Sequence, residues 1–298
     1  MRLRIGTSEP GGTFHSQGRA LATIFGRRAA LSPVEVVESN SASTQNAQRL
    51  GAGEIEFGFM ASNWIGRAKR GESPFARPLD IAMAAPMNAG PLFFVVAAGS
   101  PLRSLSDLRG RRIAVGRRNS GMAHHAQCIL AALGMSFSDF SPAYLDFAAG
   151  AQALAAGKVD AQLQCPVPNA VMTELSRKLA LRVLAYQAGE LEAVLKSVPF
   201  YRRVLMRRGA IRGLAADLPQ VAVVNVLATH PRVPEPVVRE AVAAILANIG
   251  ELSRLDPLFV GMAELFQPLR SQGAPALEFG GVPLHPGALR AYREAALL

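Results

Sequence analysis

The chain has 298 residues, a length that predicts about two domains, and 50% of its residues are hydrophobic and 18% charged. This composition excludes a disordered chain, and two cysteines are too few for a disulfide scaffold or a structural zinc site. The 32 basic residues outnumber the acidic ones and give a net charge of +10. They are scattered along the chain, aromatic residues make up only 6%, and no nucleic-acid recognition motif accompanies them. We therefore expect the charge to steer anionic ligands towards the protein, and we expect no nucleic-acid partner.

Short apolar strands alternate with helical segments in the first part of the chain. Strands are predicted over residues 3–7, 34–38 and 57–61, and helices over residues 14–28 and 44–51. Such alternation predicts an α/β fold, in which a mostly parallel sheet carries helices on both faces.

Residues 81–102 contain no charged side chain and are long enough to cross a bilayer. Their centre reads Pro-Met-Asn-Ala-Gly-Pro, however, so we predict two buried strands, 81–85 and 92–98, around a turn. Met1 leads directly into the first strand without a signal peptide. We therefore expect a soluble protein, which is cytoplasmic if Met1 is the native start and exported if a leader has been removed.

The strand pattern starts again near residue 91. Strands are predicted over 112–115, 143–147, 161–164, 181–185 and 221–229, and helices over 121–133, 149–156 and 168–179. After Pro234 the pattern is helical, over 237–249, 258–266 and a last helix with Pro286 at its first position. Two half-patterns without a linker between them suit a two-lobed protein with a cleft.

Three loops of small polar residues, 6–14, 39–46 and 116–122, each follow a predicted strand and precede a predicted helix. Ligands bind at the carboxyl ends of strands in open parallel sheets, and a helix N-terminus can hold an anion. The same residues also suit glycine turns, helix caps and, for Arg117 and Arg118, solvated cations. We predict that a small organic anion, most simply a carboxylate, is bound by Thr7, Gly12, Thr13, Phe14, Ser41, Ser43, Ser62, Asn63, Asn88, Asn119, Ser120, Gly121, Met122 and Gln164.

The sequence contains few residue patterns that are typical of catalytic or metal-binding sites. The adjacent His124 and His125 point about 100° apart on a helix, which is wrong for joint metal ligation. Cys165 follows a predicted strand and is interpreted as a buried, inert thiol, and Cys128 as a core residue. We therefore predict no catalytic residue, no metal and no cofactor, and keep an enzyme that uses Cys165 or His15 as the alternative.

Several motifs together resemble one family, the TAXI-type solute receptors of tripartite TRAP transporters. Similar to that family's motifs are Ile5-Gly6-Thr7, Gly11-Gly12-Thr13-Phe14, Ser43-Thr44-Gln45-Asn46, and the run from Leu105 to Gly116 followed by Ser120-Gly121. The most distinctive matches are Pro199-Phe200-Tyr201 and the ending Val282-Pro283-Leu284-His285-Pro286-Gly287-Ala288. The matches keep their order over nearly the whole chain.

The resemblance implies a type II periplasmic-binding-protein fold, in which two α/β lobes close on a solute held in the cleft between them. It places residues 1–90 with 226–298 in lobe 1 and residues 91–225 in lobe 2. It further implies a monomeric, non-catalytic, periplasmic receptor that delivers a carboxylate, similar to an amino acid or an oxo acid, to the membrane components of a TRAP transporter. An enzyme or a cytoplasmic sensor domain on the same fold is the alternative.

Overall fold

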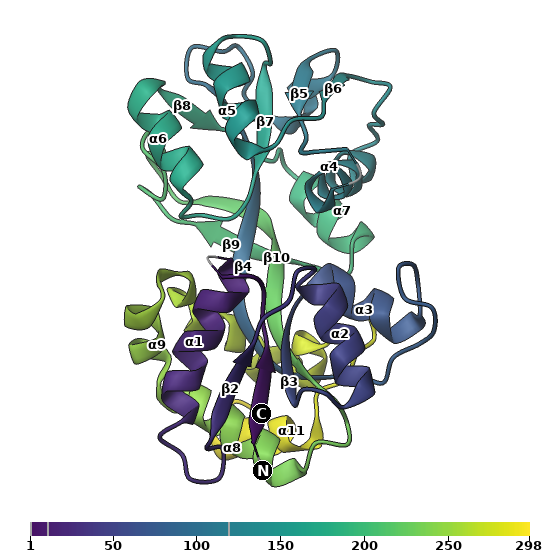
Figure 1. Cartoon of the computed structure of the whole chain (residues 1–298). Coiled ribbons are helices and arrows are strands. Elements are labelled where there is room, and N and C mark those ends of the chain that lie inside the picture. The colour runs from purple at the N-terminus through teal and green to yellow at the C-terminus, as the bar shows by residue number, and fades with distance from the viewer. Residues whose placement is uncertain (1, 11, 119) are drawn as a thin grey trace. The chain divides into compact units, whose positions relative to one another are not determined.

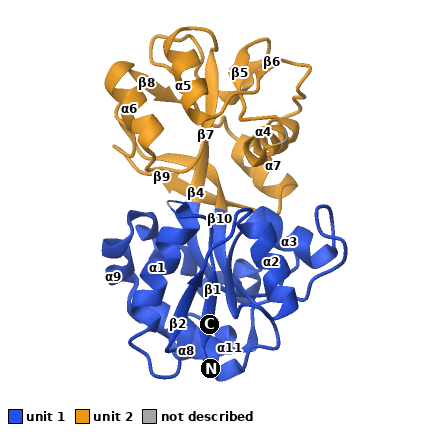
Figure 2. Cartoon of the chain, viewed as in Figure 1, with its two compact units in different colours: residues 1–89, 224–298 blue, residues 90–223 orange. Residues whose placement is uncertain are grey.

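The computed structural model describes residues 2–10, 12–118 and 120–298 (Figure 1). The chain divides into two units, coloured separately in Figure 2. Unit 1 contains residues 1–89 and 224–298, and unit 2 contains residues 90–223. Two long strands, β4 (Ala82–Ala97) and β10 (Leu218–Thr229), carry the chain from unit 1 into unit 2 and back.

The sheet of unit 1 has the strand order β2-β1-β3-β10. Its first three strands are β1 (Leu3–Gly6), β2 (Val34–Val37) and β3 (Phe57–Ala61), which agree with the predicted strands. β1 pairs in parallel with β2 and β3, whereas β10 runs antiparallel to β3. Ile5 and Phe57, which are partners in the register of β1 and β3, are fully buried in the core of this unit.

Helices cover the strands of unit 1, with α1 and α9 to the left and α2 and α3 to the right in Figure 1. The α-helices are α1 (Thr13–Phe25), α2 (Ser43–Ala52), α3 (Ser62–Arg70), α8 (Glu235–Ala247), α9 (Ile249–Leu255), α10 (Leu269–Gln272) and α11 (Pro286–Glu294). Pro286 is the first residue of α11, as predicted, and the His285 side chain accepts a hydrogen bond from the N–H of Gly287 at 3.1 Å. The predicted helix over 258–266 is wrong, because Gly261, with a φ of +82°, separates two 3₁₀ turns, Pro257–Phe259 and Met262–Phe266. A third 3₁₀ turn covers Ala274–Leu277.

The uncharged segment forms one continuous strand, β4, and the predicted turn between residues 85 and 92 is wrong. Proline removes a backbone donor, but its fixed φ is compatible with extended backbone. The pairing of β4 with β7 and β8 begins at Phe93, beyond Pro86 and Pro91, so neither proline leaves a gap in that pairing. Among the described residues, no helix is long and apolar enough to span a membrane.

Unit 2 is built around three parallel strands, in which β5 pairs with β6 and β7. Its strands are β5 (Arg112–Ala114), β6 (Ser141–Ala143), β7 (Ala161–Gln164), β8 (Leu181–Val183) and β9 (Tyr201–Met206). Its helices are η1 (Leu105–Leu108), α4 (Gly121–Ala132), α5 (Phe147–Ala155), α6 (Ala170–Lys178) and α7 (Glu190–Ser197). β4 runs antiparallel to β7 and β8. Both units therefore confirm the predicted α/β class.

The strand predicted over 143–147 is misplaced, because α5 begins within it. Asp146 is the N-cap residue of α5, and its carboxylate accepts a hydrogen bond from the N–H of Ala149 at 2.9 Å. A side chain that caps a helix commits the following residues to helical backbone. β6 consequently ends at Ala143.

Candidate functional site

In unit 1, the predicted site residues lie at the carboxyl ends of β1, β2 and β3. Thr7 directly follows β1 and is fully buried. Its N–H and its hydroxyl both donate to the carbonyl oxygen of Val37, at 2.8 and 3.1 Å, and its own carbonyl accepts from the Ser39 hydroxyl at 2.6 Å. Thr7 therefore joins the ends of β1 and β2 and builds the frame of this edge.

The glycine loop before α1 is closely packed. Gly12 is the N-cap residue of α1, and a Cβ atom at this position would lie 2.4 Å from the Ser8 hydroxyl oxygen. That oxygen accepts a hydrogen bond from the N–H of His15 at 3.1 Å. Thr13 is half-buried, whereas the ring of Phe14 is buried and stacks on Phe59 with a centroid distance of 5.4 Å. The structure thus places Phe14 in the core of unit 1.

The loop before α2 contains strained backbone. Ala42 has a φ of +40° and a ψ of −110°, a conformation that costs a non-glycine residue about 1–3 kcal/mol. Ser43 is buried and its hydroxyl oxygen accepts from the N–H of Ala61 at 3.1 Å, while Ser41 is exposed. Strain of this kind collects at functional sites, so it supports a role for this loop.

Four buried or half-buried polar residues gather where α3, β4 and β10 meet this edge. The Ser62 hydroxyl oxygen accepts from the N–H of Val224 at 3.2 Å. Asn63 is 6% exposed, and its Oδ1 has no hydrogen-bond partner among the described residues. Asn88 Oδ1 accepts from Asn225 Nδ2 at 3.1 Å. The structure therefore brings the predicted residues Ser62, Asn63 and Asn88 to one edge.

Gln17 joins this group, and both Gln17 and Asn225 were missed by the sequence analysis. Gln17 Nε2 donates to Asn88 Oδ1 at 3.0 Å, and Gln17 is fully buried on α1. Its signal in the sequence is its position three residues after Phe14 and four before Leu21, on the apolar face of the helix. An amide on such a face needs a specific partner, since an unpaired buried polar group is costly.

In unit 2, the predicted residues lie at the start of α4. Gly116 has a φ of +96°, and a Cβ atom there would lie 2.6 Å from the Cβ of Met122. The Ser120 hydroxyl oxygen caps α4 by accepting from the N–H of Ala123 at 3.2 Å. The N–H groups of Gly121 and Met122 make no hydrogen bond within the part of the chain that the structure describes, so they are free to receive an anion. Asn119 lies outside the described residues.

Arg117 and Arg118, which the sequence analysis left as possible ligand-binding cations, have partners of their own. Arg117 forms an ion pair with Asp146 at 3.0 Å, and the guanidinium of Arg118 lies 4.0 Å from the ring centroid of Tyr144. The hydrogen bond from Ala149 and the ion pair with Arg117 lower the pKa of Asp146. Any positive potential at the start of α4 therefore comes chiefly from its N–H groups.

Gln164 is the last residue of β7 and is fully buried. Neither its Nε2 nor its Oε1 has a hydrogen-bond partner among the described residues. Because β5 and β7 are parallel, with Ala114 opposite Gln162, Gln164 lies level with Gly116, at the edge where α4 begins. Buried amides without partners are rare in folded proteins, and they call for an explanation.

Histidine side chains contact a tyrosine and a cysteine in the described part of unit 2, and in each contact burial shifts the pKa of one partner, His125 or Cys128, in the direction that favours its neutral form. His125 is buried and its Nδ1 lies 2.8 Å from the Tyr201 hydroxyl. Burial raises the pKa of the Cys165 thiol to about 12, in agreement with an inert thiol. Cys128 is half-buried, with its Sγ 3.5 Å from Nε2 of His124. In the described ranges, no group of three or more His, Cys, Asp or Glu residues could hold a metal ion.

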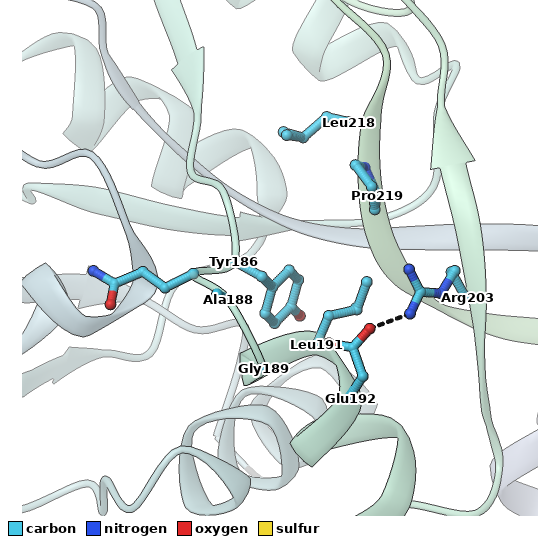
Figure 3. Close-up of a pocket in the computed structure, with 9 residues that line it drawn as sticks. Tyr186, Ala188, Gly189, Leu191, Glu192, Arg203, Leu218 and Pro219 are labelled. Atoms are coloured by element: carbon cyan, nitrogen blue, oxygen red, sulfur yellow. Dashed lines mark hydrogen bonds and ion pairs between the residues drawn. The ribbon is translucent and has the colours of Figure 1, made fainter.

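A pocket of about 440 Å³ in unit 2 lies apart from the predicted residues. Figure 3 shows that Tyr186, Leu191 and Pro219 line it, next to the ion pair of Arg203 with Glu192. Burial raises the pKa of Tyr186 well above its usual range. None of the predicted site residues lines this pocket.

The buried His125 predicts that unit 2 loses stability in acid. Burial, and to a lesser degree the charge of His124, lowers the pKa of His125 to about 3. The unfolded chain takes up this proton near pH 6.5, so the free energy of unfolding should fall as pH drops from 6.5 towards 3, by up to about 1.4 kcal/mol per pH unit. Denaturant unfolding of His125→Gln should show a shallower decline between pH 6 and 4 than the parent.

The exposed neighbour supplies the control for this measurement. His124→Gln leaves His125 buried and should keep most of the decline. The buried His230 and His285, whose pKa values are also lowered by burial, are present in every variant and cancel in the comparison. Equal slopes for His125→Gln and the parent would contradict the assignment.

Comparison with known proteins identifies the family and the fold. The model of the NMT1-like family matches residues 5–295, so the chain belongs to the NMT1-like family. Among solved structures, the aliphatic sulphonate binding protein SsuA of Escherichia coli is 18% identical, with a TM-score of 0.50, covering 100% of this chain and 88% of that one. A putative periplasmic sulfonate-binding protein of Methylobacillus flagellatus is 13% identical, with a TM-score of 0.59 and coverage of 100% and 95%.

A TctC solute-binding protein from Polaromonas is 16% identical, with a TM-score of 0.57, covering 88% of this chain and 87% of that one. At such identities the likeness concerns the fold, and it confirms the predicted fold class, the two-lobed α/β fold of periplasmic binding proteins. The solved proteins of this fold named here are periplasmic or solute-binding proteins.

Proposed function

We propose that this protein is a non-catalytic receptor that binds a small organic anion, most simply a carboxylate. The observation that carries the proposal is Gln164, a fully buried amide at the carboxyl end of a parallel strand with both polar atoms unpartnered among the described residues. A polar solute at this edge would supply the missing donor and acceptor.

Two further observations support an anion at the same edge. The N–H groups of Gly121 and Met122, which have no partner among the described residues, carry the positive end of the α4 dipole. The net charge of +10 would speed the approach of anions without deciding their affinity. In unit 1, the proposal assigns polar contacts to Thr13, Ser41 and Asn63, which lie at or near helix N-termini. The interlobe cleft stays a prediction.

The resemblance to TAXI receptors extends the proposal to a partner and a compartment. It supports a monomeric receptor that works in the periplasm with the membrane components of a TRAP-type transporter. The periplasmic origin of the structural relatives is in keeping with this compartment.

A proline at the start of α4 tests the anion site. Proline is favoured at the first helical position, and Ser120, with a φ of −78° and a ψ of 162°, already has the extended backbone that a following proline requires. Gly121→Pro should therefore remove one N–H donor with little cost in stability. Since a hydrogen bond to a charged group contributes about 1.5–3 kcal/mol, we expect carboxylate affinity to fall about tenfold or more by titration calorimetry.

Ala170→Pro makes the same change at the first position of α6, and it controls for the general effect of such a proline. Carboxylates, sulfonates, amines and neutral aromatics are first screened by thermal shift of the parent protein. Stabilisation by amines or neutral aromatics alone would contradict an anion receptor, and unchanged carboxylate binding in Gly121→Pro would remove α4 from the site.

A further inference from the structure

Three amide side chains of unit 1 form a short hydrogen-bonded chain centred on one oxygen atom. Asn88 Oδ1 accepts from Gln17 Nε2 at 3.0 Å and from Asn225 Nδ2 at 3.1 Å. The three side chains come from β4, α1 and β10 respectively. Gln17 is fully buried and Asn88 is 4% exposed, so water does not compete freely for these bonds.

This arrangement couples the orientations of the three amides, so that no one of them can rotate alone without losing a hydrogen bond. If the Asn88 amide were rotated by 180°, its Nδ2 would face two donors, and if that of Gln17 were rotated, two carbonyl oxygens would face each other. In the arrangement observed, Gln17 donates through Nε2, and its Oε1 faces away from Asn88 as a hydrogen-bond acceptor. It is buried and has no donor among the described residues.

The free oxygen lies at the edge that the proposed function assigns to the solute. Gln17 is the fifth residue of α1, one turn after Thr13, and Asn225 lies opposite Ala61 at the carboxyl end of β3. Asn63, two residues further along the chain, adds a second buried oxygen without a donor among the described residues. One amide hydrogen of Gln17 and one of Asn225 are directed at Asn88 Oδ1, and the buried polar atoms left without a partner among the described residues of this group are the oxygens of Gln17 and Asn63.

We propose that Gln17 Oε1 determines specificity by selecting solutes that present a hydrogen-bond donor, with Asn88 as the positioning residue. The inference rests on the proposed function and narrows its substrate class to carboxylates with a hydroxyl or ammonium group. A carboxylate without such a group leaves the oxygen buried and unpaired, and is rejected for that reason.

Matched pairs of acids test the proposal by titration calorimetry. The probes are malate against succinate and glutamate against glutarate, each pair differing in one donor group. In the parent, the donor-bearing member of at least one pair should bind about tenfold more tightly. Gln17→Met removes the acceptor at nearly equal volume, and it should reduce that ratio to about twofold or less by weakening the donor-bearing acid alone.

Variants of Asn88 separate positioning from simple structural support. Asn88→Leu frees the Gln17 amide to rotate, so the affinity ratio should fall, whereas Asn88→Asp keeps an oxygen that accepts from both neighbours and should restore it. Gln220→Met is the matched control, because Gln220 is equally buried in unit 2 but donates to the carbonyl oxygen of Leu184 at 3.3 Å. This control should lower the Tm and leave the ratio unchanged.

The possible outcomes separate this inference from the proposed function. If carboxylates bind the parent but the ratio is the same in Gln17→Met, the specificity role of Gln17 is wrong and the receptor proposal stands. The specificity role is equally wrong if the donor-free acids bind the parent as tightly as their partners. If none of the four acids binds while amines or aromatics do, the anion receptor itself is wrong and this inference is overturned with it.

Discussion

Gln164→Met is expected to weaken solute binding about tenfold to a hundredfold while leaving the Tm of the ligand-free protein unchanged or higher. The two effects have opposite signs because the amide is buried and unpartnered among the described residues. Leaving such a group unsatisfied costs about 1–3 kcal/mol, which methionine removes. The same amide would contribute two hydrogen bonds to a bound solute. Titration calorimetry and thermal unfolding without solute measure the two effects separately.

Gln162, on the same strand, provides the matched control. It is as deeply buried as Gln164, and its Oε1 is likewise unpartnered among the described residues, but its Nε2 donates to the carbonyl oxygen of Phe147 at 2.9 Å. Gln162→Met should therefore lower the Tm and preserve solute affinity. If Gln164→Met is destabilised like the control and binds solute like the parent, Gln164 has a structural role and the main support for a receptor is lost.

Gly116→Ala is expected to destabilise unit 2 by about 3 kcal/mol and to abolish binding at α4. The backbone of Gly116 has a φ of +96°, and the new Cβ would lie 2.6 Å from that of Met122. Strained backbone and overpacking each cost about 1–3 kcal/mol. The loop can relieve the contact only by moving Ser120 and Met122, which displaces the N–H groups assigned to the anion. Thermal unfolding and calorimetry on the same preparation measure both losses.

Gly134→Ala separates backbone strain from the contact. Gly134 also has a positive φ, of +69°, but a Cβ atom there would meet nothing within 4 Å. Its substitution should cost about 1 kcal/mol, in the range of a left-handed residue alone, and should leave binding intact. If Gly116→Ala and Gly134→Ala lose equal amounts of stability and of solute affinity, the close contact between position 116 and Met122 has no role in binding.

Local sequence signals predicted most strands and helices of this fold because apolar runs and helix signals act over short distances. The strand over 161–164 and the helix that begins at Pro286 are examples. Predictions failed where a tertiary contact or a cap decides the backbone. Pro86 and Pro91 suggested a turn, but an extended backbone tolerates both, and the Asp146 cap moved a predicted strand into α5.

The sequence predicted mainly those residues of the candidate site that lie in or next to loops between predicted elements. Ser62 and Asn63 were recognised as polar residues that follow a predicted strand, whereas Asn88 was placed in a predicted turn and lies instead inside β4. The structure brings all three to one edge. Gln17 and Asn225 lie inside regular elements, and their meeting with Asn88 depends on pairings between segments more than 70 residues apart. The partners of Arg117 and Arg118 also lie well outside their own loop, so the sequence alone did not reveal that these two cations are engaged.

The chain leaves unit 1 through β4 and returns to it through β10, and this path fixes the order in which the two units can be completed during synthesis. Residues 90–223 form unit 2, so every part of it has been made before β10 can add to the sheet of unit 1. Residues 1–89 emerge first, yet their β3 edge stays open and the helices α8 and α11 that complete this core are still missing. An incomplete unit 1, with an unpaired strand edge and exposed apolar residues, would need protection during translation. The segment made first is thus the last to be buried.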